Sequence, residues 1–366
     1  MISKITYILL NAGGYSTAAK NRIEAISKGL KIHAIEVKLI EITNKRSYKN
    51  DLLNKTILAL KYFYVSIGLL RKSKKNDAFV FYGHFPYINF LLKFKRKETK
   101  IIAERNEFPS SELIHSEPKS ALIKRSLNYC KNIELFDGFI SCSNELINFY
   151  SQYSKDFKYI IIPTIIDHEK FESSENQSLN RANYITYCGD WGNSKDGVSI
   201  LIKAFAVLIN EFPNHTLRLI GGTKNKIEES NILNLIKDLK LNDYVKIEGR
   251  VKHDVIPHML QESKILALAR PNNKQASGGF PSKITEYLAT GVPTLVTNVG
   301  DIEKYFSFES IQFAEPDSYE NFAEKLKYII QNYDHAKRIA ANGVKINRQF
   351  DYKAQGEKLK KFIQSI

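Results

Sequence analysis

The chain is short of the features that mark secreted, disulfide-stapled or membrane-spanning proteins. Its 366 residues include only three cysteines, Cys130, Cys142 and Cys188, whose positions match neither a metal-ligand spacing nor a disulfide framework. No uninterrupted run of about 18 or more apolar residues exists, so we expect no transmembrane helix, and the N-terminus lacks the architecture of a signal peptide. We therefore expect a protein of a reducing compartment, the cytoplasm.

Several familiar chemical signatures are missing as well. The sequence has no H-E-x-x-H motif, Walker loop, nucleophile elbow, zinc-binding cluster or aspartate-x-aspartate metal motif. It also lacks low-complexity segments, repeats of about 20–50 residues and the motifs of nucleic-acid-binding domains. These absences speak against metalloprotease, P-loop and α/β-hydrolase chemistry, and we expect no nucleic-acid partner.

What remains is the composition of a globular protein with two domains. Hydrophobic residues make up 43% of the chain and charged residues 25%, and the length suits two cores. The net charge of +15 is uneven: residues 1–165 hold 27 Lys and Arg against 14 Asp and Glu, whereas residues 166–366 hold 27 against 25. This favours an anionic partner for the N-terminal half: a membrane surface, a nucleic acid or a phosphorylated substrate. A merely soluble basic face is the alternative.

Short apolar runs of strand length alternate with helical patterns along the whole chain. This alternation predicts an α/β protein with two doubly wound, Rossmann-like parallel sheets. We expect an N-terminal domain over residues 1–166 and a C-terminal domain over 167–349, with a last helix, about 350–366, packed back on the first domain. The predicted strands are 4–10, 35–40, 78–82, 100–103, 137–142 and 159–162, then 184–188, 217–220, 245–248, 264–269 and 294–297.

Residues 56–75 form an unusual apolar and basic segment. Thr56 to Leu70 is nearly all apolar or aromatic, and four Lys and Arg follow within the next five residues. Fifteen helical residues span about 22 Å, too short to cross a bilayer comfortably. The helix could lie in a membrane interface with its basic residues on the headgroups. A helix buried in the N-terminal core is the alternative, because apolar residues on all sides also mark core helices.

The stretch from Lys264 to Asp301 combines a strand, a glycine pair, a helix and a second strand. Backbone N–H groups before a helix start, together with the helix dipole, suit a phosphate. Lys283 adds a full charge in the first turn, and Glu286 can accept hydrogen bonds from sugar hydroxyls. An ordinary strand-to-helix turn, with these two side chains as a solvated pair, is the equal alternative.

The N-terminal half offers weaker candidates. A second glycine loop, Asn11 to Gly14, precedes a helix but lacks the full dinucleotide fingerprint. Functional groups in open α/β sheets gather at the carboxyl ends of strands. That rule adds a second set of candidates, namely His84, Glu104, Arg105 and Glu107, with a purely structural loop histidine as the alternative for His84.

Several motifs of the C-terminal half follow one another in a particular order. They are G-x₅-K-x-G-V from Gly189, a strand followed by Gly221-Gly222, G-R-V from Gly249, and GGFPSK-x-x-EYLATGVP from Gly278. This succession resembles the retaining glycosyltransferases of glycosyltransferase family four. The resemblance is strong over about residues 184–305 and weak in the first half. It implies the GT-B fold, with two facing Rossmann-like domains and an active site in the cleft between them.

The resemblance also implies roles for individual residues. Lys195 is similar to the lysine that neutralises the donor diphosphate, and Glu286 to the second glutamate of the E-x₇-E signature, which holds the ribose. The other donor contacts it implies are Gly189, Arg270 and Lys283, the backbone of Gly278, Gly279 and Phe280, and Arg250 and Val251 near the base. The acceptor side would come from the N-terminal domain, with Gly13, Gly14, His84 and Glu107 as candidates, His84 among the catalytic ones.

Two positions depart from the family pattern. The first glutamate of E-x₇-E is replaced by Gly278, and an arginine usual after the glycine of the lysine loop is replaced by Asp190. Lys283 and Arg270 could supply the missing positive charge. The glycine at 278 removes a carboxylate that faces the donor sugar in the family.

The function that the resemblance implies is transfer of a sugar from a UDP- or GDP-linked donor, with retention and without a metal or other cofactor. The acceptor would be a glycan or a lipid-linked acceptor in bacterial cell-surface polysaccharide synthesis: capsule, O-antigen or exopolysaccharide. The enzyme would then be cytoplasmic and peripheral at the inner face of the membrane. A nucleotide-sugar epimerase or hydrolase on the same fold, or a catalytically silent binding module, are the alternatives.

Overall fold

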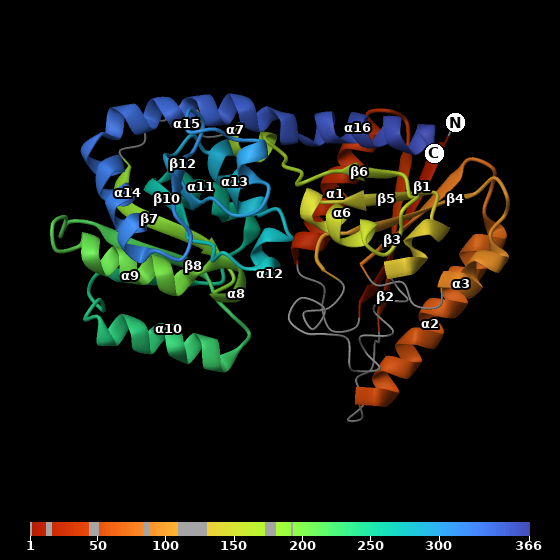
Figure 1. Cartoon of the computed structure of the whole chain (residues 1–366), viewed down its shortest axis with the longest axis horizontal. Helices are drawn as coiled ribbons and strands as arrows, with labels where there is room; N and C mark the ends of the chain where they lie inside the picture. Colours follow the sequence, from red (N-terminus) through yellow and green to blue (C-terminus); the bar gives the residue numbers. More distant parts are fainter. Residues whose placement is uncertain are drawn as a thin grey trace. The chain divides into compact units, whose positions relative to one another are not determined.

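The computed structural model describes residues 2–11, 17–43, 51–83, 88–108, 130–172, 181–191 and 193–366. The chain forms two compact units, each an α/β sandwich with helices on both faces of one sheet (Figure 1). Unit 1 comprises Met1–Ile165 and Phe350–Ile366, and unit 2 comprises Ile166–Gln349. The last helix, α16 (Tyr352–Ser365), therefore belongs to unit 1.

Unit 1 contains a six-stranded parallel sheet in the order β2-β1-β3-β4-β5-β6. Its strands are β1 (Lys4–Asn11), β2 (Glu36–Thr43), β3 (Asp77–Tyr82), β4 (Lys100–Arg105), β5 (Gly138–Ser141) and β6 (Tyr159–Ile161). Its helices are α1 (Thr17–Lys31), α2 (Asp51–Lys72), α3 (Ile88–Leu91), α6 (Asn144–Ser151) and α16, with 3₁₀ turns at Leu92–Phe94 and Asn132–Leu135.

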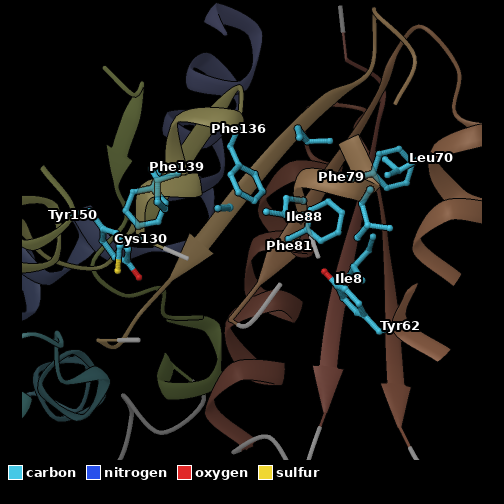
Figure 2. Close-up of a cluster of buried hydrophobic side chains, with 14 of the residues drawn as sticks. Ile8, Tyr62, Leu70, Phe79, Phe81, Ile88, Cys130, Phe136, Phe139 and Tyr150 are labelled. Carbon is cyan, nitrogen blue, oxygen red and sulfur yellow. The ribbon is translucent and has the colours of Figure 1, made fainter. Parts of the chain in front are cut away.

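Side chains alternate across this sheet and build one hydrophobic core on each face. On one face, strand residues such as Ile5 and Val80 pack against α1 and α16. On the other face, Phe79, Phe81 and Phe139 pack against α2, α3 and α6 (Figure 2). The near-continuous apolar strands of the sequence thus reflect a sheet that is covered on both sides.

Two glycines let α16 lie directly against α1. A Cβ atom on Gly29 would collide with the backbone carbonyl of Tyr352, and one on Gly356 would collide with the backbone of Gly29. The two helices therefore approach each other as closely as their backbones allow. The start of α6 is capped, because the Ser143 side chain accepts a hydrogen bond from the Leu146 N–H at 3.2 Å.

The apolar segment of α2 is partly a core helix. Leu58, Tyr62 and Leu70 are buried in the core of unit 1, where Figure 2 shows Tyr62 and Leu70 on the side of the strand residues Ile8 and Phe79. The core-helix alternative is thus correct for this face of α2, while the opposite face stays exposed. In the described residues, no helix is both long enough and apolar enough to span a bilayer.

Unit 2 contains a second six-stranded parallel sheet in the order β12-β11-β10-β7-β8-β9. Its strands are β7 (Ala182–Gly189), β8 (Thr216–Gly221), β9 (Val245–Gly249), β10 (Ser263–Leu268), β11 (Thr294–Thr297) and β12 (Gln312–Ala314). Its helices are α7 (Glu169–Glu172), α8 (Asn193–Asp196), α9 (Val198–Leu208), α10 (Lys226–Asp238), α11 (Ile256–Gln261), α12 (Lys274–Ser277), α13 (Ser282–Ala289), α14 (Tyr319–Gln331) and α15 (Tyr333–Asn347). The predicted pair of doubly wound parallel sheets is confirmed.

Candidate functional site

The carboxyl ends of β7 and β10 lie side by side, because these two strands are neighbours in the sheet of unit 2. The segment after β7 leads through Asp190 and Trp191 into the short helix α8, which carries Lys195 and Asp196. The segment after β10 leads through Arg270 and α12 into α13, which carries Lys283 and Glu286. Two segments that are far apart in the sequence therefore meet at one edge of the sheet, where α/β proteins bind ligands.

Asp196 is the centre of a buried charge cluster at this edge. Its Oδ2 accepts hydrogen bonds from Lys283 Nζ at 2.7 Å and from Tyr187 Oη at 2.8 Å, and its Oδ1 lies 3.5 Å from Arg270 Nη1. Burial disfavours the charged carboxylate, but the charges of Lys283 and Arg270 outweigh it and lower the pKa of Asp196. The carboxylate is therefore ionised, and this cluster holds two cations against one anion.

Tyr187 and two glycines shape the cluster. Burial, and next the charge of Asp196, raise the pKa of Tyr187 well above its usual range, so its hydroxyl stays protonated and donates. A Cβ atom on Gly189 would overlap the side chain of Lys283, so the glycine makes room for the lysine at the end of β7. Gly197 has φ +61°, and a Cβ there would collide with the carbonyl of Ala269, so this turn requires glycine.

Arg270 joins the cluster to the surrounding backbone. Its side chain is buried, its Nη2 donates to the carbonyl of Ala276 on α12, and its own carbonyl accepts from Thr297 Oγ1 at 2.7 Å. Arg270 thus ties β10, α12 and β11 together as well as facing Asp196. Its role is partly structural, whereas the Lys283 ammonium is more accessible, with 21% of the side chain exposed.

Glu286 lies one turn after Lys283 on α13 and is half-buried. Burial raises the pKa of its carboxyl, and the charges of Lys283 and Lys170 counteract this only in part. Among the described residues, no side chain or backbone group forms a hydrogen bond or ion pair with this carboxylate. A partly dehydrated carboxylate without a protein partner is suited to hydroxyl groups of a ligand.

The opposite face of α13 fixes the helix to the sheet. Ile284, Tyr287 and Leu288 are buried, as their spacing predicts, and Tyr287 Oη accepts a hydrogen bond from the Cys188 N–H at 2.8 Å. Burial, followed by the charge of Glu286, raises the pKa of the half-buried Cys188 thiol to about 12, so this cysteine is uncharged. Lys283 and Glu286 thereby keep fixed positions beside this packed face, Lys283 against Asp196 and Glu286 half-buried.

The start of α13 offers backbone donors. The N–H groups of Ser282 and Lys283 have no acceptor in the described part of the chain, and Pro281 provides no side-chain cap. The Gly278 N–H, by contrast, donates to the carbonyl of Lys274 at 2.9 Å, because the unpredicted helix α12 ends there. Phe280 packs edge-on against the ring of Tyr305, with 5.5 Å between ring centroids.

The remaining predicted donor residues are placed differently. Lys195 is half-buried on α8, directly before Asp196. Arg250 and Val251 follow β9, the edge strand, which is separated from β7 by β8. Within the described ranges, no hydrogen bond or ion pair joins Arg250 to the Asp196 cluster.

Of the candidates in unit 1, Gly13, Gly14 and His84 lie outside the described residues. Glu107 is exposed after the end of β4. Glu104 and Arg105, by contrast, are buried: Glu104 Oε1 accepts from Arg22 Nε at 2.6 Å, and Arg105 Nε donates to Tyr150 Oη at 3.1 Å. The interpretation of these two as residues around a cleft is replaced by a structural role inside unit 1.

Asp196 and Tyr187 are the site residues that sequence reasoning missed. Asp196 is the variable residue between the lysine and the glycine of the K-x-G motif, and nothing in the sequence marks it as buried. Its partners come from β10 and α13, so only the tertiary structure identifies it. A weak signal was available, because a carboxylate beside a candidate phosphate-binding lysine needs a cation to balance it.

Comparison with known proteins adds the family. Residues 169–346 match the family of glycosyl transferases group 1. The fold resembles sucrose-phosphate synthase from Thermosynechococcus elongatus (14% identity, TM-score 0.75, covering 99% of this chain and 98% of the other). It also resembles a glycosyltransferase from Rickettsia africae (16% identity, TM-score 0.75, covering 99% of this chain and 98% of the other). A third similar structure is the Anabaena protein HepE in complex with UDP-glucose (15% identity, TM-score 0.70, covering 99% of this chain and 100% of the other).

No curated protein matches the chain by sequence. At these identities the solved structures establish the fold, which is of the GT-B type with a parallel sheet in each unit. The family match falls within unit 2 and contains the Asp196 cluster and the whole of α13. Residues 169–346 of unit 2 thus form a domain of the glycosyl transferases group 1, and the fold of both units is that of the solved structures named above.

Proposed function

We propose that unit 2 binds the diphosphate and ribose of a UDP- or GDP-linked sugar at α13, and that the sugar passes with retention to a glycan or lipid-linked acceptor. The observation that carries this proposal is the Asp196 cluster, where Lys283 and Arg270 face one carboxylate beside unused N–H groups of a helix start. An excess of buried positive charge at a helix N-terminus suits a diphosphate. HepE, which shares the fold, binds UDP and UDP-glucose.

In this mechanism the protein stabilises the leaving group. When the bond between the sugar and the donor diphosphate breaks, negative charge grows on the diphosphate oxygen. Lys195, Lys283 and the first N–H groups of α13 are the groups assigned to that charge, and Asp196 holds the Lys283 ammonium in place before the donor arrives. Preorganised charges of this kind stabilise a transition state because they need no rearrangement during the reaction.

Glu286 is assigned to the ribose. Its carboxylate lacks a partner in the described structure, and it lies one helical turn beyond Lys283. A ligand whose phosphates lie at the start of α13 would bring its ribose hydroxyls toward this next turn, where the carboxylate accepts their hydrogen bonds.

Lys283 also accounts for one departure from the family pattern. The residue after Gly189 is Asp190 where the family has an arginine, and the Lys283 side chain passes directly over Gly189. We assign to Lys283 the charge that this arginine would supply. Arg270 is the weaker substitute, because one of its terminal nitrogens is bound to the carbonyl of Ala276. With lysine and backbone donors in these roles, the reaction is proposed to be metal-independent.

We assign binding of the acceptor to unit 1, which is strongly basic. We assign the reaction to cell-surface polysaccharide synthesis in a bacterial cytoplasm. The basic excess of residues 1–165 suits a phosphorylated or lipid-linked acceptor. Glu107 is the described candidate on that side.

Binding of nucleoside diphosphates and nucleotide-sugars tests the donor site. The single tryptophan, Trp191, is buried in the segment between β7 and α8, so its fluorescence reports on this site. Thermal unfolding gives a second readout, because a ligand at about a hundred times its dissociation constant adds about 2.7 kcal/mol of stability. We expect UDP or GDP to stabilise the wild type, and Lys195→Ala and Glu286→Ala to reduce the shift.

The matched control is Lys226→Ala, an exposed lysine on α10 of the same unit, which should leave the shift unchanged. Activity with added chelator tests metal independence and should not change. Absence of any nucleotide effect on the wild type contradicts the proposal. Release of free or epimerised sugar without an acceptor would assign a hydrolase or epimerase instead, and binding without turnover would assign a silent binding module.

A further inference from the structure

The outer face of α2 carries apolar side chains where a surface helix ordinarily carries polar ones. With 3.6 residues per turn, Leu53, Leu60 and Tyr64 fall on one stripe, opposite the buried stripe of Leu58 and Tyr62. Leu60 is 63% exposed and Tyr64 is 82% exposed. We call Leu53, Leu60 and Tyr64 the outer stripe.

Aromatic rings extend this apolar surface beyond α2. Phe63, next to the outer stripe, packs against Phe90 of α3 with 5.2 Å between ring centroids, and Phe90 packs against Phe94 at 5.3 Å. Phe90 is itself partly exposed. Figure 1 shows α2 and α3 side by side on one flank of unit 1. The apolar surface is therefore shared by two elements that hold each other in place.

Basic side chains border the apolar surface. Lys61 lies beside the outer stripe, Arg71 and Lys72 form the last turn of α2, and Lys93 lies over the ring of Phe90 at 5.6 Å. All four are exposed. In the described structure none of these four forms an ion pair with an acidic residue. Their charges are thus available to an anionic partner.

We propose that α2 and α3 form the surface by which this protein docks on an anionic lipid bilayer. Exposed leucine and tyrosine would enter the boundary between headgroups and acyl chains, and the bordering Lys and Arg would pair with lipid phosphates. Tyr62 and Leu70 stay in the core of unit 1, so α2 lies along the membrane and does not cross it. A protein partner with an acidic surface would match the charges but not the stripe of large apolar side chains.

Flotation of the full chain with lipid vesicles tests this assignment. Vesicles of phosphatidylcholine alone are compared with vesicles in which about a third of the lipid is phosphatidylglycerol, at low and at high salt. We expect binding only to the anionic vesicles, weakened by salt. The double variant Leu60→Ser/Tyr64→Ser should bind at least about tenfold more weakly. The triple variant Lys61→Gln/Arg71→Gln/Lys72→Gln should lose on the order of a hundredfold.

The matched control removes two exposed apolar side chains from unit 2. Ile227 and Phe308 are each 72% exposed, and Ile227→Ser/Phe308→Ser should bind vesicles like the wild type. Because all the substituted residues are exposed, thermal unfolding should change little in each variant. The UDP- or GDP-induced shift should also persist, since the donor site lies in unit 2; its loss in the wild type would contradict the proposed donor site and not the membrane surface.

Three outcomes would overturn the assignment. The first is no binding to anionic vesicles at low salt. The second is equal binding by the wild type and the Leu60→Ser/Tyr64→Ser variant. The third is self-association of the wild type, seen by sedimentation and abolished in that variant, without vesicle binding, which would assign the outer stripe to a second copy of the chain.

Discussion

Each unit buries an ion pair at the carboxyl end of its parallel sheet. The two ion pairs differ in how far the charge of their cations is balanced within the protein. In unit 1, Arg22 donates to Glu104 at 2.6 Å and to the carbonyls of Ile162 at 2.7 Å and Pro163 at 3.5 Å. In unit 2, Lys283 and Arg270 share the single carboxylate of Asp196. Each of the three side-chain nitrogens of Arg22 is thus bound within its own unit, and its charge is balanced by Glu104, whereas the Asp196 cluster keeps an excess of positive charge.

This difference separates a structural ion pair from a binding site within one fold type. Both sit where α/β proteins bind ligands, so position alone does not distinguish them. Access and charge balance do: Glu104 is completely buried, while Lys283 keeps part of its side chain exposed. A buried cation whose charge is balanced by its own protein stabilises the fold, and a surplus cation near unused N–H groups favours a ligand.

The largest effect should come from breaking the Arg22–Glu104 pair of unit 1. Glu104→Ala leaves the Arg22 guanidinium buried without a counter-charge, which costs about 3–5 kcal/mol of folding free energy. Denaturant unfolding measures it, with Glu36→Ala, which breaks an exposed pair with Lys4, as the mild control. Unchanged stability together with loss of nucleotide binding would show that the comparison between the two clusters is wrong.

The second effect concerns turnover and should leave folding intact. Lys195→Ala removes a half-buried cation assigned to the donor diphosphate, so kcat should fall by about 100- to 1,000-fold, or about 3 kcal/mol. The measurement is sugar transfer per enzyme at saturating donor, beside Lys226→Ala as the neutral control. If turnover stays at the wild-type rate, Lys195 does not act on the leaving group.

Most of the fold could be predicted, because the signals are local. The strand predicted over 294–297 coincides with β11, since Pro293 bars helix before it and every residue of the run is buried. The predicted strand 217–220 lies within β8 (Thr216–Gly221), where the four residues of the apolar run are buried. The short elements α12 and β12 were not predicted, because a run of three or four residues shows no hydrophobic periodicity and its structure depends on tertiary neighbours.

The candidate site was predicted in outline and not in detail. Lys283 and Glu286 stand out because one helix start offers both a cation and an acceptor, and Arg270 because it follows a strand. The charge balance of the site depends on Asp196, which contacts Lys283 and Arg270 across the fold. No spacing rule records such a contact. The buried roles of Glu104 and Arg105 were missed for the same reason, since their partners lie on α1 and α6.

The third prediction removes the anion of the donor site. Asp196→Asn leaves Lys283 and Arg270 facing each other without a counter-charge, so stability at neutral pH should fall by about 2 kcal/mol. The folded pKa of Asp196 is lowered, so its contribution is present above the ordinary carboxyl pKa and is lost as pH falls through the folded value. The difference in Tm between wild type and variant should therefore close on acidification. A difference that is independent of pH would mean that shape, and not charge, explains it.

The smallest effect should have the opposite sign and the opposite pH dependence. The folded pKa of Glu286 is raised, chiefly by burial, so its contribution to stability is full below the ordinary carboxyl pKa and is lost as pH rises through the folded value. Glu286→Gln should therefore be slightly more stable than the wild type at neutral pH and equal to it in acid. Nucleotide affinity should fall by about tenfold, because the ribose loses a charged acceptor. Thermal unfolding against pH, with and without UDP, measures both. A variant that is less stable at neutral pH would show that Glu286 already has a partner in the protein, whereas a gain in stability with a loss of binding marks a carboxylate kept for its ligand.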